Sequence, residues 1–169
     1  MKQLTRVVPT IGAYCGGVII GIVASKQVYQ NALTHPHQIA ALAIIQHNAT
    51  VLGIMFLGII TLGIVTLGVL FLNGALLGLT LGVYTLRGKL FPLLFALAPH
   101  GILEVGAFLL AGYADWFLVT ELWQCIRSPN KERWRQQQPM IQRCLLFNVI
   151  ALVMLIVAGY IEHTLFLTV

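Results

Sequence analysis

The side chains best suited to chemistry in this sequence lie within one apolar stretch near its middle. His100 and Glu104 are four residues apart, so on a helix both project from the same face, about 6 Å apart along the axis. Two alanines and Asp115 continue that face within about 60° of arc. The spacing predicts a polar stripe with small residues between its polar members.

A carboxylate in lipid is unfavourable, by at least about 2.5 to 3.5 kcal/mol on insertion scales. We therefore expect Glu104 to face protein or water, with His100 as its nearest partner. A functional role and a structural hydrogen bond to a neighbouring helix both satisfy this requirement, and the sequence leaves both open. Pro99 fits the beginning of a helix, because its missing N–H has no partner there.

Two asparagines also interrupt apolar sequence. Asn73 precedes Gly74, and such a pair either forms hydrogen bonds between helices or restarts a helix after a break. Asn48 stands at the start of a long apolar run, where an N-cap is expected. Helix punctuation is the simpler interpretation of all three residues.

The sequence contains none of the catalytic motifs G-x-S-x-G, G-x-x-x-x-G-K and H-E-x-x-H. His100 and Glu104 alone are too few to make a metal site. We predict a protein that is not an enzyme and has no cofactor and no metal.

The composition excludes a soluble domain. Hydrophobic residues make up 59% of the 169 residues, charged residues only 9%, and the mean hydropathy is +0.89. Because no stretch is polar enough to fold separately, residues 1–169 are predicted to form a single, all-α, polytopic membrane domain. About five transmembrane helices are expected, near residues 7–25, 44–63, 66–86, 100–123 and 144–163.

One part of this division stays open. Ala49 to Thr85 carries no charge and would be roughly 55 Å long as one helix, which is too long for one span. A turn near Thr61 to Thr66 gives two spans, whereas a break near Asn73 gives one span and a shorter re-entrant piece. Phe91 to Ala98 is too short to cross and is predicted to be interfacial or re-entrant.

Glycines recur at spacings that favour close helix packing. Four-residue pairs occur at positions 12/16 and 17/21, and a four-residue series occurs at 74, 78 and 82. The glycines at 58, 63 and 68 recur every five residues, wind around a helix, and indicate an irregular segment.

Charge predicts the orientation. The net charge is +5, and four of the ten basic residues lie between Arg127 and Arg135. Such a cluster beside a span favours a cytoplasmic loop, here 124–143, over a nucleic-acid site. With the N-terminus cytoplasmic, five crossings of the cell membrane keep this loop on the cytoplasmic side and place the C-terminus outside. Arg87 and Lys89 then lie on the outer side.

The chain resembles the stage II sporulation protein M family of multi-pass membrane proteins. The resemblance rests on Asn48, on "FLNGALLG" from Phe71, and above all on "APHGILEVGAFLLAG" from Ala98. It implies about five spans with the N-terminus inside. It also implies a shared polar centre, formed here by Asn73, Gly74, Pro99, His100, Gly101 and Glu104.

Sporulation members of this family are linked to engulfment, where they help to assemble cell-wall-remodelling proteins in the septal membrane. Together with the many small-residue packing faces and the absence of a catalytic set, this favours a non-enzymatic scaffold that contacts other membrane proteins within the bilayer, and association with its own copies stays open. The alternative is a small transporter or channel whose polar pathway surrounds His100 and Glu104 and uses a broken helix at Asn73. A metal-dependent intramembrane hydrolase is a third, less supported alternative.

Overall fold

A computed structural model describes residues 4–29, 41–127 and 131–166, with side chains placed for 7–29, 46–127 and 138–164. The described chain is helical throughout, which confirms the all-α fold class. Its elements are α1 (Leu4–Tyr29), α2 (Ala41–Phe56), the short 3-10 helix η1 (Leu57–Ile59), α3 (Ile64–Leu86), α4 (Leu90–Arg127) and α5 (Lys131–Phe166).

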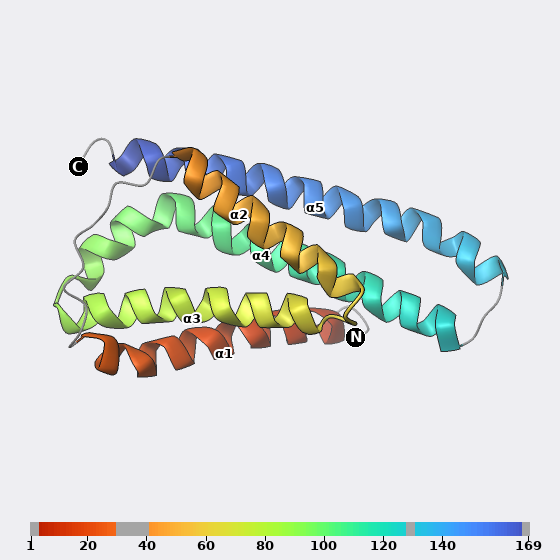
Figure 1. Cartoon of the computed structure of the whole chain (residues 1–169), viewed down its shortest axis with the longest axis horizontal. Coiled ribbons are helices and arrows are strands. Elements are labelled where there is room, and N and C mark those ends of the chain that lie inside the picture. Colours follow the sequence, from red (N-terminus) through yellow and green to blue (C-terminus); the bar gives the residue numbers. More distant parts are fainter. Residues whose placement is uncertain (1–3, 30–40, 128–130, 167–169) are drawn as a thin grey trace.

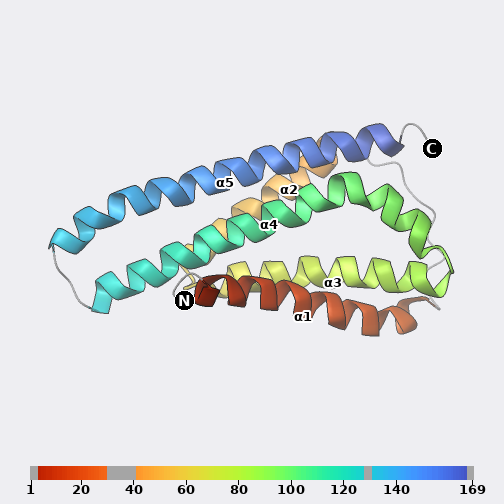
Figure 2. The same ribbon diagram turned by 180° about the vertical axis from the view of Figure 1, so that it is seen from behind.

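Successive long helices run in opposite directions along the molecule (Figure 1). The beginning of α1, the turn between α2 and α3, and the end of α4 lie towards one end. The turn between α3 and α4 and the end of α5 lie at the other end, as the reverse view confirms (Figure 2). As a result, α1 and α3 run parallel, and Arg87 after α3 lies over the ring of Tyr29 at the end of α1.

Glycines let the backbones of α1 and α3 touch. A Cβ atom added at Gly17 or Gly21 would overlap the carbonyl oxygens of Phe71 and Ala75, respectively. From the other side, a Cβ at Gly74 or Gly78 would overlap carbonyl oxygens of α1. The predicted close packing of the glycine series at 74, 78 and 82 is confirmed. Of the two glycine pairs on α1, the pair 17/21 contacts α3.

The chain reverses between α2 and α3 through η1 and a left-handed turn. Leu62 and Gly63 have φ values of 53° and 87°, and the Gly63 N–H donates to the Gly58 carbonyl at 2.7 Å. Glycine adopts positive φ without a steric penalty, so this position suits a sharp reversal. Of the two predicted turns, the one near Thr61 to Thr66 is correct. The irregular segment inferred from the glycines at 58, 63 and 68 is confirmed at the first two, whereas Gly68 lies within the regular helix α3.

Four helices among the described residues are long and apolar enough to span a membrane. They cover Val7–Tyr29, Ile64–Leu86, Leu90–Arg127 and Gln138–Thr164. The described α2 has only 16 residues, about 24 Å at 1.5 Å per residue, which is short of a hydrocarbon layer of roughly 30 Å. The expected count of five spans is therefore not confirmed.

Two predicted segment boundaries need correction. Residues 91–98 form the first part of α4 and are continuous with the helix that follows, so a separate interfacial or re-entrant segment is not confirmed. The basic stretch 124–143 is not a loop, because α4 extends to Arg127 and α5 begins at Lys131; residues 128–130 lie outside the described chain. Its Lys, Arg, Glu and Gln residues are strong helix formers, which explains why the helices continue past the apolar sequence.

Candidate functional site

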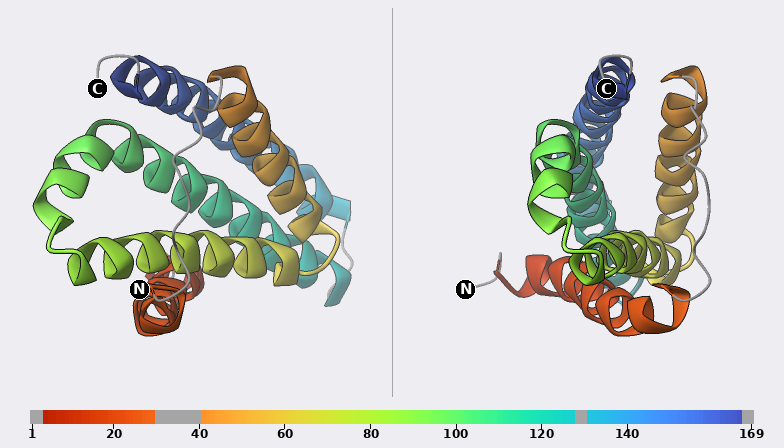
Figure 3. Two further views of the ribbon diagram at one scale, coloured as in Figure 1. Left: turned by 60° about the vertical axis from the view of Figure 1, so that its left-hand side comes forward. Right: turned by 90° about the vertical axis from the view of Figure 1, so that its left-hand side faces the viewer.

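The bend of α4 opens a space beside α3. Pro99 lies inside α4, where proline removes a backbone hydrogen bond and its ring clashes with the carbonyl four residues earlier. The first part of α4 therefore leads away from the end of α3 before the helix turns back along the molecule (Figure 3). The sequence predicted that Pro99 begins a helix. This prediction is wrong, because Pro99 lies inside α4 and bends it.

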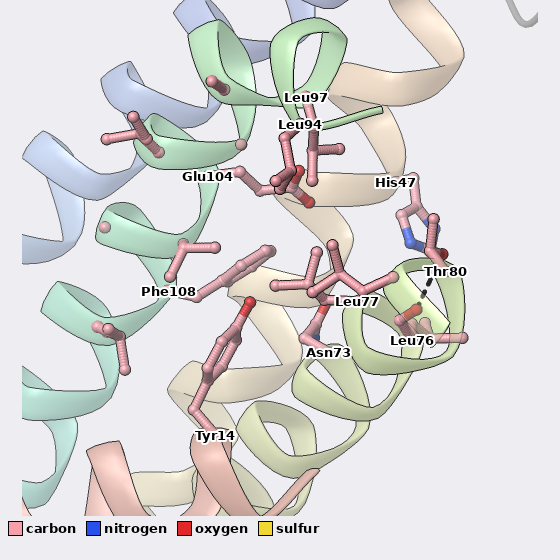
Figure 4. A pocket seen from close by; sticks show the side chains of 17 residues that line it. Tyr14, His47, Asn73, Leu76, Leu77, Thr80, Leu94, Leu97, Glu104 and Phe108 are labelled. Atoms are coloured by element: carbon pink, nitrogen blue, oxygen red, sulfur yellow. Dashed lines mark hydrogen bonds between the residues drawn. The ribbon is translucent and has the colours of Figure 1, made fainter. Parts of the chain in front are cut away.

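A pocket of about 730 Å³ lies between α3 and this part of α4. Its walls are mainly leucine and other apolar side chains, while Tyr14 reaches it from α1 and His47 from α2 (Figure 4). Of the residues proposed as a polar centre, the lining includes Asn73, Gly101 and Glu104. The structure thus brings three of the six predicted residues to one cavity.

Glu104 is the only carboxyl group among the described residues that line this pocket, and it is partly buried. Its side chain extends towards Leu94 and Leu97, above the ring of Phe108 (Figure 4). The hydroxyl of Tyr14 and the carboxyl of Glu162 are close enough to interact with it electrostatically. No hydrogen bond to Glu104 is formed within the described part of the chain, and Figure 4 shows its carboxyl group extending into the pocket.

His100 is not part of this cavity. It is only 7% exposed, and its Nδ1 atom has no hydrogen-bond partner among the described residues. The helical spacing that places His100 and Glu104 on one face holds, but no hydrogen bond joins the two side chains in the described structure. The expected His100–Glu104 pair is thus not observed.

Asn73 does not interrupt α3. Its Nδ2 donates to the Val69 carbonyl one turn earlier at 3.0 Å, and the helix continues through Gly74 to Leu86. Gly74 contacts the Tyr14 backbone on the side that faces α1. The predicted break at this pair is wrong, because the glycine packs closely against α1 and the asparagine donates to a carbonyl of its own, continuous helix.

Asn48 is likewise not an N-cap. It lies well inside α2 and is 4% exposed, so it faces the protein interior. The apolar run that begins after Asn48 suggested a helix start, but the preceding residues from Ala41 are already helical.

Asp115 lies at a separate polar cluster deeper in the bundle. The carboxyl group is fully buried and contacts the hydroxyl of Thr66 on α3 and the amide nitrogen of Asn148 on α5, each at 3.4 Å. Thr66 also donates to the Met55 carbonyl at 2.9 Å, which links α2 to the cluster. Asp115 therefore holds helices together and does not extend the pocket.

Sequence reasoning missed Tyr14, Phe108, Thr66 and Asn148. Each is an ordinary residue within an apolar helix, and its importance follows only from the helix that packs against it. For Thr66 and Asn148 the sequence did offer a signal. Polar side chains within membrane-spanning sequence must find hydrogen-bond partners. Among the described residues, no group of three or more His, Cys, Asp or Glu side chains is placed to hold a metal.

The long apolar helices and the polar groups enclosed between them define a polytopic helical membrane protein. Comparison with known families gives a closer assignment. The chain belongs to the stage II sporulation protein M family, a family of membrane proteins, whose model matches residues 10–165. No curated protein and no solved structure matches the chain.

Proposed function

We propose that this protein is a non-enzymatic scaffold that assembles other membrane proteins through contacts within the bilayer of the cell membrane. Membership of the stage II sporulation protein M family supports a membrane role. The observation that carries the proposal is an outward face of α1 that has the composition of a helix-packing surface and no partner within the described chain.

The two sides of α1 differ in what they contact. The inward side, formed by Thr10, Tyr14, Gly17, Gly21 and Ser25, is buried. The outward face consists of Val8, Gly12, Cys15, Gly16, Ile19 and Val23; Ile19 and Val23 are 63% and 70% exposed. A Cβ atom added at Gly12 or Gly16 would meet nothing within 4 Å.

Exposed apolar side chains alone say little in a membrane, because lipid covers them as well as protein does. Small residues one turn apart are more informative, since they permit the close backbone approach that drives association of helices in lipid. The pair Gly17/Gly21 already serves this purpose against α3. Gly12 and Gly16 offer the same kind of surface to a helix from another protein.

Cys15 allows a direct test. It is the exposed cysteine of the three in the chain, whereas Cys125 and Cys144 are buried. A photoreactive cross-linker attached to Cys15 in native membranes is expected to join the chain to a specific second membrane protein. Gly16→Leu should abolish that adduct, and Gly68→Leu should not, because Gly68 is also open but lies on α3.

Cross-linking to lipid alone would overturn the proposal. An adduct that persists unchanged in Gly16→Leu would also contradict it, because the outward face of α1 would then not determine the contact. A specific adduct with a second copy of this chain would replace the hetero-scaffold with self-assembly. The transporter alternative assumed a broken helix at Asn73. It lacks this support, because α3 is continuous through Asn73.

A further inference from the structure

The pocket between α3 and α4 is mainly apolar with a few polar groups, and the proposed assembly through α1 gives it no role. Its volume of about 730 Å³ falls in the range of small-molecule sites, which are roughly 300 to 1,000 Å³ and mostly apolar with a few polar groups. Leucine is the commonest residue of its lining and comes from both helices. A ligand for it needs a hydrocarbon body.

The polar groups of the pocket indicate the other half of the ligand. Glu104 is directed into the cavity, and no Lys or Arg is among the described lining residues. The other titratable groups there are the Tyr14 hydroxyl and His47, which lies beside Thr80 and apart from Glu104 (Figure 4). This environment favours a positive charge and repels an anion.

Aromatic rings stand next to the carboxyl group. Figure 4 shows the Phe108 ring below Glu104, and the Tyr14 side chain rises towards the same region from α1. A cation held near a carboxylate and against aromatic faces gains both a charge-assisted hydrogen bond and a cation–π interaction. A neutral alcohol would leave the carboxyl group without its counter-charge, and a fatty acid would bring a like charge.

We propose that this pocket binds a lipophilic amine, a molecule with one protonated nitrogen on a hydrocarbon body, with the nitrogen at Glu104 and the hydrocarbon among the leucines of α3 and α4. The ammonium group donates to the carboxyl oxygens and lies against Phe108 and Tyr14. The site does not depend on the outward face of α1, so it stands or falls separately from the scaffold role.

Dodecylamine, dodecanol and dodecanoic acid are suitable probes because they share one chain length and differ only in the polar group. Binding to the purified full-length chain in uncharged phosphatidylcholine nanodiscs is measured by equilibrium dialysis, with empty nanodiscs giving the partition background. Dodecylamine is expected to bind saturably, and dodecanol and dodecanoic acid only at the background level. Glu104→Gln should weaken dodecylamine binding roughly ten- to a hundredfold, as loss of a charged hydrogen bond predicts.

Two further variants separate loss of the site from loss of the fold. Glu162→Gln makes the same chemical change on α5 outside the pocket lining, and it is expected to weaken dodecylamine binding much less than Glu104→Gln does, so that binding stays saturable. Ala98→Phe fills the pocket while the carboxyl group stays, and it is expected to abolish binding. Circular dichroism and gel filtration check each variant for folding.

The location is tested with a dodecylamine that carries a diazirine near the end of its chain. Photolabelling is expected at Leu77, Leu97 or neighbouring lining residues. Equal binding of the amine and the alcohol would overturn the proposal, as would unchanged affinity in a folded Glu104→Gln protein or labelling confined to lipid-facing helix surfaces.

Discussion

At the scale of single residues, the Asp115 cluster joins the helices α2, α3, α4 and α5. The hydroxyl of Thr66 has one proton, and its shorter contact, 2.9 Å, is to the Met55 carbonyl on α2. The same oxygen lies 3.4 Å from the Asp115 carboxyl on α4, which in turn contacts Asn148 on α5. A single threonine therefore connects the α2–α3 turn to the central buried carboxyl group.

Thr66→Val is expected to destabilise the bundle, because it keeps the shape of the side chain and removes the hydroxyl. Hydrogen bonds between membrane helices contribute about 0.6 kcal/mol on average and up to about 1.7 kcal/mol. We expect the free energy of unfolding to fall by about 1 to 2 kcal/mol, measured by titration with sodium dodecyl sulfate in mixed micelles.

Thr80→Val is the matched control for this experiment. Within the part of the chain that the structure describes, the Thr80 hydroxyl donates only to the Leu76 carbonyl of its own helix, at 3.0 Å. Its loss is expected to change the unfolding free energy by less than about 0.5 kcal/mol. Equal effects of the two variants would show that the cluster contributes nothing specific to helix packing.

At the scale of elements, the parallel contact of α1 and α3 depends on missing Cβ atoms. Gly78→Ala is expected to destabilise the protein by about 1 to 3 kcal/mol, the usual range for overpacking, because the new methyl group would overlap the Val18 carbonyl. Gly68→Ala on the same helix meets nothing within 4 Å and is expected to be neutral or slightly stabilising. Detergent unfolding compares them, and an equal loss in both would contradict the contact.

The bend of α4 gives a second prediction at this scale. Pro99→Ala restores a backbone N–H inside the helix and is expected to straighten it, which increases the distance between spin labels at the exposed positions Phe91 and Trp123. Double electron–electron resonance measures this distance in nanodiscs.

The control is Pro92→Ala. Pro92 lies in the first turn of α4, where a missing N–H has no helical partner, so its replacement should leave the distance unchanged. An unchanged distance in Pro99→Ala would mean that packing against the neighbouring helices, rather than the proline, sets the bend.

The same elements show what the sequence alone can predict. The glycine series at 74, 78 and 82 gave the contact face of α3 correctly, because a four-residue period fixes a helical face. Pro99 was misinterpreted as a helix start, because proline is compatible with both a first turn and an interior bend, and the choice depends on tertiary packing. Glu104 was identified through its charge, whereas Tyr14 and Phe108 were not, since no local pattern tells which helices enclose a pocket.

At the scale of the whole molecule, the alternating helix directions have a topological consequence. The beginning of α1 and the end of α4 share one end of the structure, while the α3–α4 turn and the end of α5 share the other (Figure 1). The basic first part of α5, from Lys131, then lies at the same end as the beginning of α1. Positive charge near span ends favours the cytoplasmic side, so we expect this end to face the cytoplasm.

This orientation is tested with single cysteines in a chain whose three native cysteines are replaced by serine or alanine. Lys89→Cys, in the exposed α3–α4 turn, is expected to react with a membrane-impermeant maleimide in intact cells. Arg127→Cys, at the exposed end of α4, should react only after permeabilisation. Labelling of both positions from the same side would show that α4 does not cross the membrane. The reversed labelling pattern would contradict the expected orientation in the membrane but not the fold. The beginning of α1 and the basic stretch lie at the same end of the bundle whichever way it is inserted.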